Sequence, residues 1–153
     1  PVDLMAGYRT EINLRAGDWL AQIAARLERG YVLTFDYGYE RERYFAPEHR
    51  DGTLLCYHRH TKHDDPYRHI GEQDITAHVE FTSLMEQGAA LGLETVRFTD
   101  QSRYLVEIGE PVIREIVERD AGQPSKERQA IHQLIHPELM GRTFRVLLQR
   151  KAS

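Results

Sequence analysis

Tyr31-Val32-Leu33-Thr34-Phe35-Asp36-Tyr37-Gly38 is the stretch that decides the fold. Its first six residues are mostly β-branched, aliphatic or aromatic, and such a continuous run predicts a strand covered on both faces. The segment before it, from Ala16 to Arg29, repeats apolar residues at steps of three and four, which predicts a helix closed by Gly30. A helix that leads straight into a buried strand is half of a βαβ unit. The sequence therefore indicates an α/β fold.

The segment 37–73, which follows this strand, has no periodicity. It is polar and rich in histidine, and prolines and glycines interrupt it at Pro47, Gly52, Pro66 and Gly71. Irregular segments of this length are rare in compact domains unless they are functional or disordered. The short run Leu54-Leu55-Cys56-Tyr57 favours an insertion that is packed and functional.

The rest of the chain alternates predicted helices and strands. Asp74 or Thr76 is expected to cap a helix that Gly92 closes. The further predicted elements are a strand at 95–99, a short helix at 101–108 broken at Gly109, a helix beginning at Pro111, a turn at 121–125, a helix from Ser125 to about His136, and a strand at 143–149. This order is α/β, with few strands for a complete doubly wound sheet.

Composition limits the classes of function. The 153 residues, 41% apolar and 29% charged, fit one domain with its own core. The formal net charge of −4 argues against a nucleic-acid partner, because phosphate contacts need an excess of Lys and Arg. No apolar run approaches the roughly 20 residues that span a bilayer, so no membrane partner is expected.

The single cysteine and the first residue bear on the origin of the chain. Cys56 alone excludes an intrachain disulfide and favours a reducing compartment, so we expect a cytoplasmic location. Its apolar neighbour Leu55 predicts a core position for the thiol rather than a reactive one. Because the sequence opens at Pro1 without methionine, we expect it to be a piece of something longer.

Asp36 and Tyr37 are the first candidates for a functional site. Ligands of α/β proteins bind outside the carboxyl ends of the strands, where these two residues fall. A charged residue that ends a buried strand is costly unless it has a partner, which favours a functional Asp36. Gly38 and Gly71 are expected to supply positive φ in turns. No glycine-rich turn joins a first strand to a first helix, so a nucleotide-type cofactor site cannot be complete within this chain.

The order and spacing of these segments resemble the MidA-type S-adenosylmethionine-dependent methyltransferases, which include the mitochondrial complex I assembly-factor methyltransferases. The resemblance covers almost the whole chain. Glu80 stands where the family usually has Asp, and Tyr104 stands where Phe is common. The segments that carry the resemblance are Glu11, Trp19, Asp36-Tyr37-Gly38, Gly52-Thr53-Leu54 with Tyr57 to His60, Gly71, Asp74-Ile75-Thr76, Val79-Glu80-Phe81, Gln101 to Tyr104-Leu105, Ile108-Gly109, and His136 to Gly141 with Phe144 and Val146.

The resemblance implies a place for each part of the chain. Residues 1–153 would form a single domain that is the C-terminal part of a Rossmann-like methyltransferase sheet. The strand ending at Asp36 would be the fifth of that sheet, and those near Thr95 and Thr143 the sixth and seventh, the last inserted antiparallel. Residues 37–73 would be a substrate-facing insertion, and 101–141 a mainly helical one. The family's N-terminal half, which holds most of the S-adenosyl-L-methionine site, is absent, so this chain alone is expected to be inactive.

The resemblance also implies a substrate and its binding residues. Protein arginine would be the methyl acceptor, in a partner such as a respiratory complex subunit, and the apolar edge left by a missing half could drive homodimer formation. Carboxylates suit this acceptor because they hold a planar guanidinium and draw its charge. The implied catalytic residues are Asp36, Tyr37 and His60, and the implied substrate-binding residues are Glu11, Tyr57, Asp74, Thr76, His78, Glu80 and Gln101.

Other interpretations stay open beside this one. Asp74 could serve as a helix cap alone, and His78 and Glu80 could be merely solvated. The His58-x-His60-x-x-His63 run, with His69 nearby, could suggest a metal-dependent hydrolase, but one flexible loop is a poor source of ligands, and no metal is expected. The main alternative is a non-catalytic protein-interaction module that retains part of the methyltransferase fold.

Overall fold

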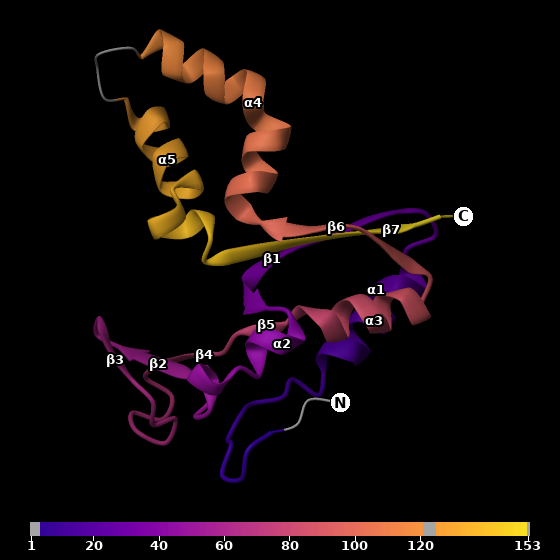
Figure 1. The fold of residues 1–153 in the computed structure, drawn as a ribbon, viewed down its shortest axis with the longest axis vertical. Coiled ribbons are helices and arrows are strands. Elements are labelled where there is room, and N and C mark those ends of the chain that lie inside the picture. Colours follow the sequence, from indigo (N-terminus) through magenta and orange to yellow (C-terminus); the bar gives the residue numbers. More distant parts are fainter. Residues whose placement is uncertain (1–3, 121–124, 153) are drawn as a thin grey trace.

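A four-stranded mixed sheet organises the described part of the chain, which is residues 4–120 and 125–152 of a computed structural model. The strand order is β5-β1-β7-β6, and β7 runs antiparallel to both of its neighbours. Figure 1 shows these strands between two groups of helices. The α/β fold class and the antiparallel insertion of the last strand are both confirmed. The strands are β1 (Gly30–Tyr39), β5 (Val79–Glu80), β6 (Leu93–Asp100) and β7 (Phe144–Lys151).

The hydrophobic core lies on one face of this sheet, under α1 (Ala16–Arg26) and α3 (Phe81–Ala90). Both helices turn an apolar stripe toward β7, which matches the predicted periodicity of α1. Gly92 follows α3 with a φ of 79°, as expected for a residue that closes a helix. The buried side chains of this core are Leu20, Ala24, Phe81, Leu84, Leu93 and Leu147.

The opposite face of β1 is open in this chain. Tyr31, Leu33, Phe35 and Tyr37 alternate along it with exposed fractions of 62%, 47%, 38% and 39%. The prediction of a strand covered on both faces is therefore wrong for these residues, because α1 and α3 pack on the same side. The strand also continues to Tyr39, and β5 pairs only with its last two residues. The remainder of this edge, residues 30–37, has no strand partner in the described part of the chain.

Two long helices form an arm that projects away from the sheet (Figure 1). They are α4 (Gln101–Arg119) and α5 (Lys126–Ile135), followed by a kinked turn at Pro137–Gly141. The predicted break at Gly109 and new start at Pro111 are wrong: α4 is continuous, because Pro111 removes only one backbone hydrogen bond and α4 packs along α5. Ser125 caps α5 as predicted, by accepting from the N–H of Arg128 at 3.0 Å. The rest of the turn predicted at 121–125 falls outside the described residues.

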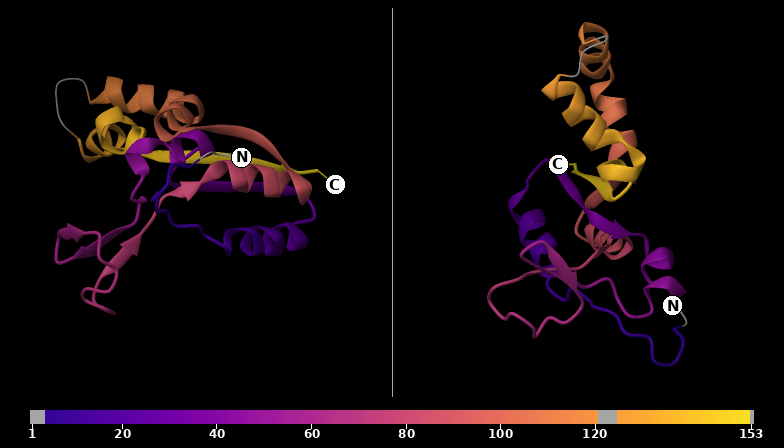
Figure 2. Two further views of the ribbon diagram at one scale, coloured as in Figure 1. Left: turned by 60° about the horizontal axis from the view of Figure 1, so that its bottom comes forward. Right: turned by 90° about the vertical axis from the view of Figure 1, so that its left-hand side faces the viewer.

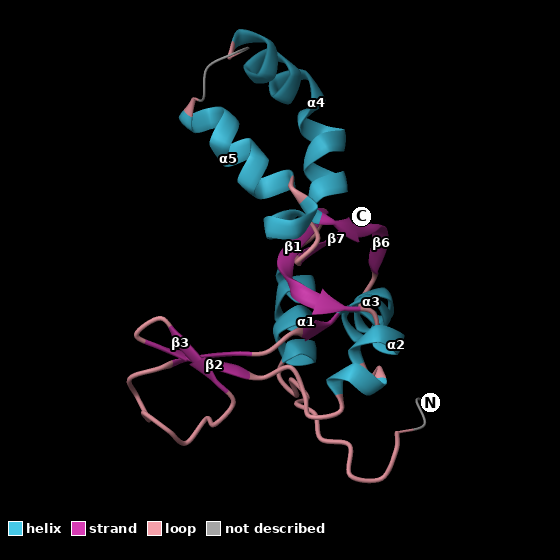
Figure 3. Ribbon diagram, turned by 60° about the vertical axis from the view of Figure 1, so that its left-hand side comes forward, coloured by secondary structure: helices cyan, strands magenta, loops and turns pink. Residues whose placement is uncertain are grey.

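The insertion after β1 is more regular than predicted. Two short helices, α2 (Arg41–Tyr44) and the 3-10 helix η1 (Pro47–His49), lead to a second sheet of order β3-β2-β4. Figures 2 and 3 show this small sheet beside the main body. Its strands are β2 (Leu55–His58), β3 (Thr61–His63) and β4 (Asp74–Thr76). Cys56 is fully buried, which confirms its predicted core position, and burial followed by the charges of Asp65 and Asp64 raises the pKa of its thiol.

Asp74 and Thr76 are strand residues, so the prediction that they cap a helix is wrong. Both pair with β2, with Asp74 opposite Tyr57 and Thr76 opposite Leu55. Helix α3 begins only at Phe81, and its cap is Glu80. The segment around Ile75 pairs with a neighbouring strand instead, and the helical period starts only at Phe81.

Gly38 also differs from its prediction. It lies inside β1 rather than in a turn, and its φ is not positive. A Cβ at this position would stand 2.1 Å from the carbonyl oxygen of Val79, so the close approach of β5 requires glycine. Gly71, by contrast, has a φ of 80°, as predicted.

Candidate functional site

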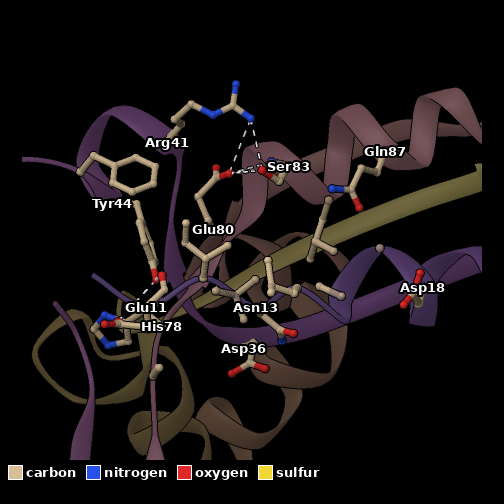
Figure 4. Close-up of a pocket in the computed structure, with 18 residues that line it drawn as sticks. Glu11, Asn13, Asp18, Asp36, Arg41, Tyr44, His78, Glu80, Ser83 and Gln87 are labelled. Atoms are coloured by element: carbon tan, nitrogen blue, oxygen red, sulfur yellow. Dashed lines mark hydrogen bonds and ion pairs between the residues drawn. The ribbon is translucent and has the colours of Figure 1, made fainter. Parts of the chain in front are cut away.

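A pocket of about 800 Å³ opens at the carboxyl end of β1. Its walls come from the segment before α1, from β1 and α2, and from the residues that join β4 to α3. Figure 4 shows Asp36 at the floor of the view, Glu11 and His78 on one side, and Arg41 with Glu80 above them.

No helix in the described part of the chain is both long and apolar enough to cross a bilayer.

The lining of the pocket is acidic. Four carboxylates line it, from Glu11, Asp18, Asp36 and Glu80, and the only arginine or lysine in the lining is Arg41. That guanidinium is already engaged, because it pairs with Glu86 at 2.5 Å and lies 3.6 Å from Glu80. The pocket therefore favours a cationic ligand.

Asp36 has a single hydrogen-bond partner among the described residues. Its Oδ1 accepts a hydrogen bond from the N–H of Tyr37 at 2.8 Å. Arg145 stands opposite Asp36 on β7, but the two form no ion pair among those of the described residues. Asp36 is half-buried, so it presents a carboxylate with free acceptor capacity to the pocket.

Glu80 holds the start of α3. Its carboxylate accepts from the N–H groups of Thr82 at 2.8 Å and Ser83 at 3.0 Å, and also from the Ser83 hydroxyl. With the Arg41 guanidinium nearby, these contacts satisfy both carboxylate oxygens. The substrate-binding role implied for Glu80 stays a prediction beside this structural one.

Glu11 ties the N-terminal segment to the insertion. Its Oε1 accepts from the N–H of Thr53 at 2.7 Å, from the Thr53 hydroxyl, and from the Tyr44 hydroxyl at 3.4 Å. The Thr53 oxygen in turn accepts from the N–H of His78 at 2.9 Å. Burial and the charge of Glu11 raise the pKa of Tyr44, which keeps its phenol a donor. This chain of contacts fixes the side of the pocket where His78 lies.

His78 lines this side of the pocket and has a ring nitrogen without a hydrogen-bond partner among the described residues. Its Nδ1 is buried and has no hydrogen-bond partner, while its ring lies against Tyr39 with the ring centroids 5.0 Å apart. Burial, helped by the charge of His49, lowers the pKa of His78, and the charges of Glu11 and Asp36 oppose this only in part. The imidazole is therefore biased to its neutral form, which can accept a proton.

The structure brings together four of the residues that the sequence implied, namely Glu11, Asp36, His78 and Glu80. Tyr37 lies on the other face of β1, where its ring packs on Phe144 at a centroid distance of 4.1 Å. Tyr37 is therefore close to the site in sequence but outside the pocket lining.

The other implied residues also lie outside the lining, and their roles stay predictions. His60 is exposed in the turn between β2 and β3, and Tyr57 is 42% exposed on β2. Asp74 is exposed on β4, and the Thr76 hydroxyl donates to the Leu55 carbonyl at 3.3 Å. Gln101 is buried, and its amide donates to the Leu134 carbonyl at 2.9 Å, which joins α4 to α5.

Several pocket residues were not predicted from the sequence. Arg41 and Tyr44 stand on α2, a single turn of helix that is too short to show a period. Asp18 lies in the first turn of α1, where an acid needs no further explanation than the helix dipole. Asn13 belongs to the segment before α1, and nothing in its sequence context marks it.

Comparison with known proteins gives the family. Residues 1–99 match the family described as "Putative S-adenosyl-L-methionine-dependent methyltransferase". No curated protein matches the chain. Two solved structures from Burkholderia thailandensis, both of COG1565 superfamily proteins, are each 35% identical to it. The one bound to S-adenosyl-homocysteine has a TM-score of 0.87 over 97% of this chain and 39% of its own, and the native one has 0.89 over 98% and 40%. This chain thus spans about two fifths of their length, and it belongs to the S-adenosylmethionine-dependent methyltransferase family.

Proposed function

We propose that this chain is the substrate-facing part of a MidA-type S-adenosylmethionine-dependent methyltransferase whose methyl acceptor is arginine in a protein. The observation that carries the proposal is the acidic pocket at the carboxyl end of β1, with Asp36 free to accept. A guanidinium suits this pocket because its planar fork of N–H donors matches carboxylate oxygens.

The residues of this chain do not complete a cofactor site. The sequence has no glycine-rich turn between a strand and a helix, and four carboxylates line the pocket, which disfavours the carboxylate group of S-adenosylmethionine there. When bound in the whole enzyme, the cofactor supplies the methyl group. We therefore assign the residues of this chain to the acceptor.

Two side chains, Asp36 and His78, would act on the methyl acceptor. Asp36 would pair with the guanidinium and fix the orientation of the attacking nitrogen, since orientation supplies much of the rate of a displacement. His78, which burial biases to the neutral form, lines the same pocket and could accept the proton that leaves this nitrogen. Glu11 would act indirectly, by holding Thr53 and with it the backbone of His78.

The test is methyl transfer by the full-length protein to arginine and lysine peptides, with amino-acid analysis of the product. We expect methylarginine, and we expect Asp36→Asn to lower kcat by about 10²-fold or more with cofactor affinity unchanged. Asp51→Asn is the matched control, because Asp51 is exposed and, among the described residues, forms its one ion pair with Arg9. A methyl group on another residue type would refute the arginine assignment, and wild-type turnover in Asp36→Asn would remove Asp36 from the mechanism.

The expectations about partners and location belong to the same proposal. A protein substrate, of the class represented by respiratory complex subunits, is supported by the acidic pocket and by the open insertion beside it. A homodimer of this chain by itself is supported by the exposed apolar face of β1, which the remaining part of a longer methyltransferase would otherwise cover. The single cysteine supports a cytoplasmic location, since such compartments keep thiols reduced.

A further inference from the structure

The small sheet of the insertion has almost no core of its own. Its three strands contain ten residues, from β2, β3 and β4, and Cys56 is the only buried one. A sheet this small is not stable on the hydrophobic effect alone. Small units of this kind are commonly held by a disulfide or a metal, and the chain has only one cysteine.

Three metal-ligating side chains converge beside this sheet. One ligand atom each from His58, His69 and Glu72 lies within 4.8 Å of the others. The rings of His58 and His69 lie at a centroid distance of 4.0 Å, and no hydrogen bond joins them among those of the described residues. Around a tetrahedral Zn²⁺, donors at about 2.0–2.2 Å from the ion stand about 3.3 Å apart, so small side-chain rotations would close this set.

A third histidine, His63, lies near His69. Both ring nitrogens of His63 are buried and have no hydrogen-bond partner. A buried imidazole without a partner is costly unless a ligand satisfies it. The centroid of its ring is 6.0 Å from that of His69. The register between β2 and β3 places His63 opposite Cys56, on the same face of the sheet as His58.

The ligands do not come from one free loop, which was the reason to expect no metal from the sequence. His58 ends β2 and His63 ends β3, and the loop 64–73 returns to β4, which also pairs with β2. The loop is held internally by Gln73, whose amide donates to the Pro66 carbonyl at 2.7 Å, and by the N–H of Glu72, which donates to the His69 carbonyl at 2.9 Å. His69 keeps a φ of 59° there, an uncommon conformation for a residue other than glycine.

We propose that His58, His69 and Glu72 bind one transition-metal ion of the Zn²⁺ class, with His63 as the fourth ligand. Imidazole and carboxylate donors in a four-ligand set suit this ion, and four protein ligands indicate a structural role. The ion would fasten the loop 64–73 to β2. Because β4 leads directly to Ala77 and His78, it would also stiffen one wall of the pocket.

The test is titration of Zn²⁺ into metal-free protein of this sequence, by calorimetry and with Co²⁺ absorption as a report of coordination. We expect one ion per chain, a rise in Tm on binding, and a four-coordinate Co²⁺ spectrum. His69→Ala and Glu72→Gln should each weaken binding by about 10²-fold or more, by loss of a direct ligand. Glu72 is exposed, so Glu72→Gln should fold normally, which circular dichroism checks.

His132→Ala is the matched control. His132 and His136 form another histidine pair, with ring centroids 4.7 Å apart, and neither belongs to the cluster of His58, His69 and Glu72. Its removal should leave Zn²⁺ affinity unchanged. Weak binding that falls equally in all three variants, or no binding at all, would overturn the proposal.

Discussion

Glu80 shows how one side chain can serve the fold at a functional site. It caps α3 through two backbone N–H groups and is nearly covered by Arg41 and Ser83. We predict that Glu80→Ala lowers the free energy of unfolding by about 1–2 kcal/mol, the usual value of a lost N-cap. Glu86→Ala, which removes only the exposed partner of Arg41, should change it by less than about 1 kcal/mol. Urea denaturation measures both, and equal effects would contradict the capping role.

His78 makes a prediction about pH. Its folded-state pKa lies below the ordinary 6.5, because burial and His49 disfavour the charged form. Between the lowered folded-state pKa of His78 and 6.5, the unfolded state binds more protons than the folded state. The contribution of His78 to the free energy of unfolding is therefore present above pH 6.5 and is lost as the pH falls below it. Urea denaturation between about pH 8 and pH 5 should show this loss. His78→Gln should be less pH-sensitive than the wild type, and identical pH profiles would count against a shifted His78.

Among single residues, the sequence predicted those whose position has a visible physical reason. It missed those that carry no such signal. Asp36 could be predicted because a charge at the end of a strand must find a partner or a function. The cap at Glu80 could not, because the segment at Asp74 to Thr76 offered equally good capping residues. Arg41 and Tyr44 reach the pocket from α2, which is only one turn long and leaves no periodic signal.

Among the secondary-structure elements, the contact of β1 with β5 depends on Gly38. We predict that Gly38→Ala lowers the free energy of unfolding by about 1–3 kcal/mol, since the new methyl group would overlap the Val79 carbonyl oxygen. Gly109→Ala should instead raise it by about 0.5–1 kcal/mol, because Gly109 lies in α4 with its nearest neighbour 3.5 Å from the added carbon. Thermal and urea unfolding measure the pair, and the same sign for both would contradict the model of β5 pressed on Gly38.

Local sequence patterns predicted the helices and strands that have a strongly apolar face. They failed where a partner that is distant in the sequence determines the secondary structure. The periods of α1 and the alternation of β7 are visible in the sequence, and both elements formed. Strand β4 forms because it pairs with β2, and α4 continues past Pro111 because α5 packs beside it. Such partners lie tens of residues away and leave no mark on the local sequence.

At the scale of the whole molecule, the notable feature is the open side of β1. One edge of the strand and the face that carries Tyr31, Leu33 and Phe35 stay uncovered in the described residues. Unpaired edges and apolar faces of this kind require a partner. The two Burkholderia proteins are more than twice as long as the part that this chain matches. We therefore expect the remaining part of a methyltransferase to pack on this side and to hold the cofactor.

Calorimetric titration of S-adenosylmethionine tests most directly whether the cofactor site lies outside this chain. The ligand would be titrated into this chain and into the same chain extended by the N-terminal half expected from the family. We predict saturable binding to the extended form and none to the chain alone, because the sequence has no glycine-rich turn to hold the cofactor and carboxylates line the described pocket. Binding of comparable affinity to the chain alone would contradict the account.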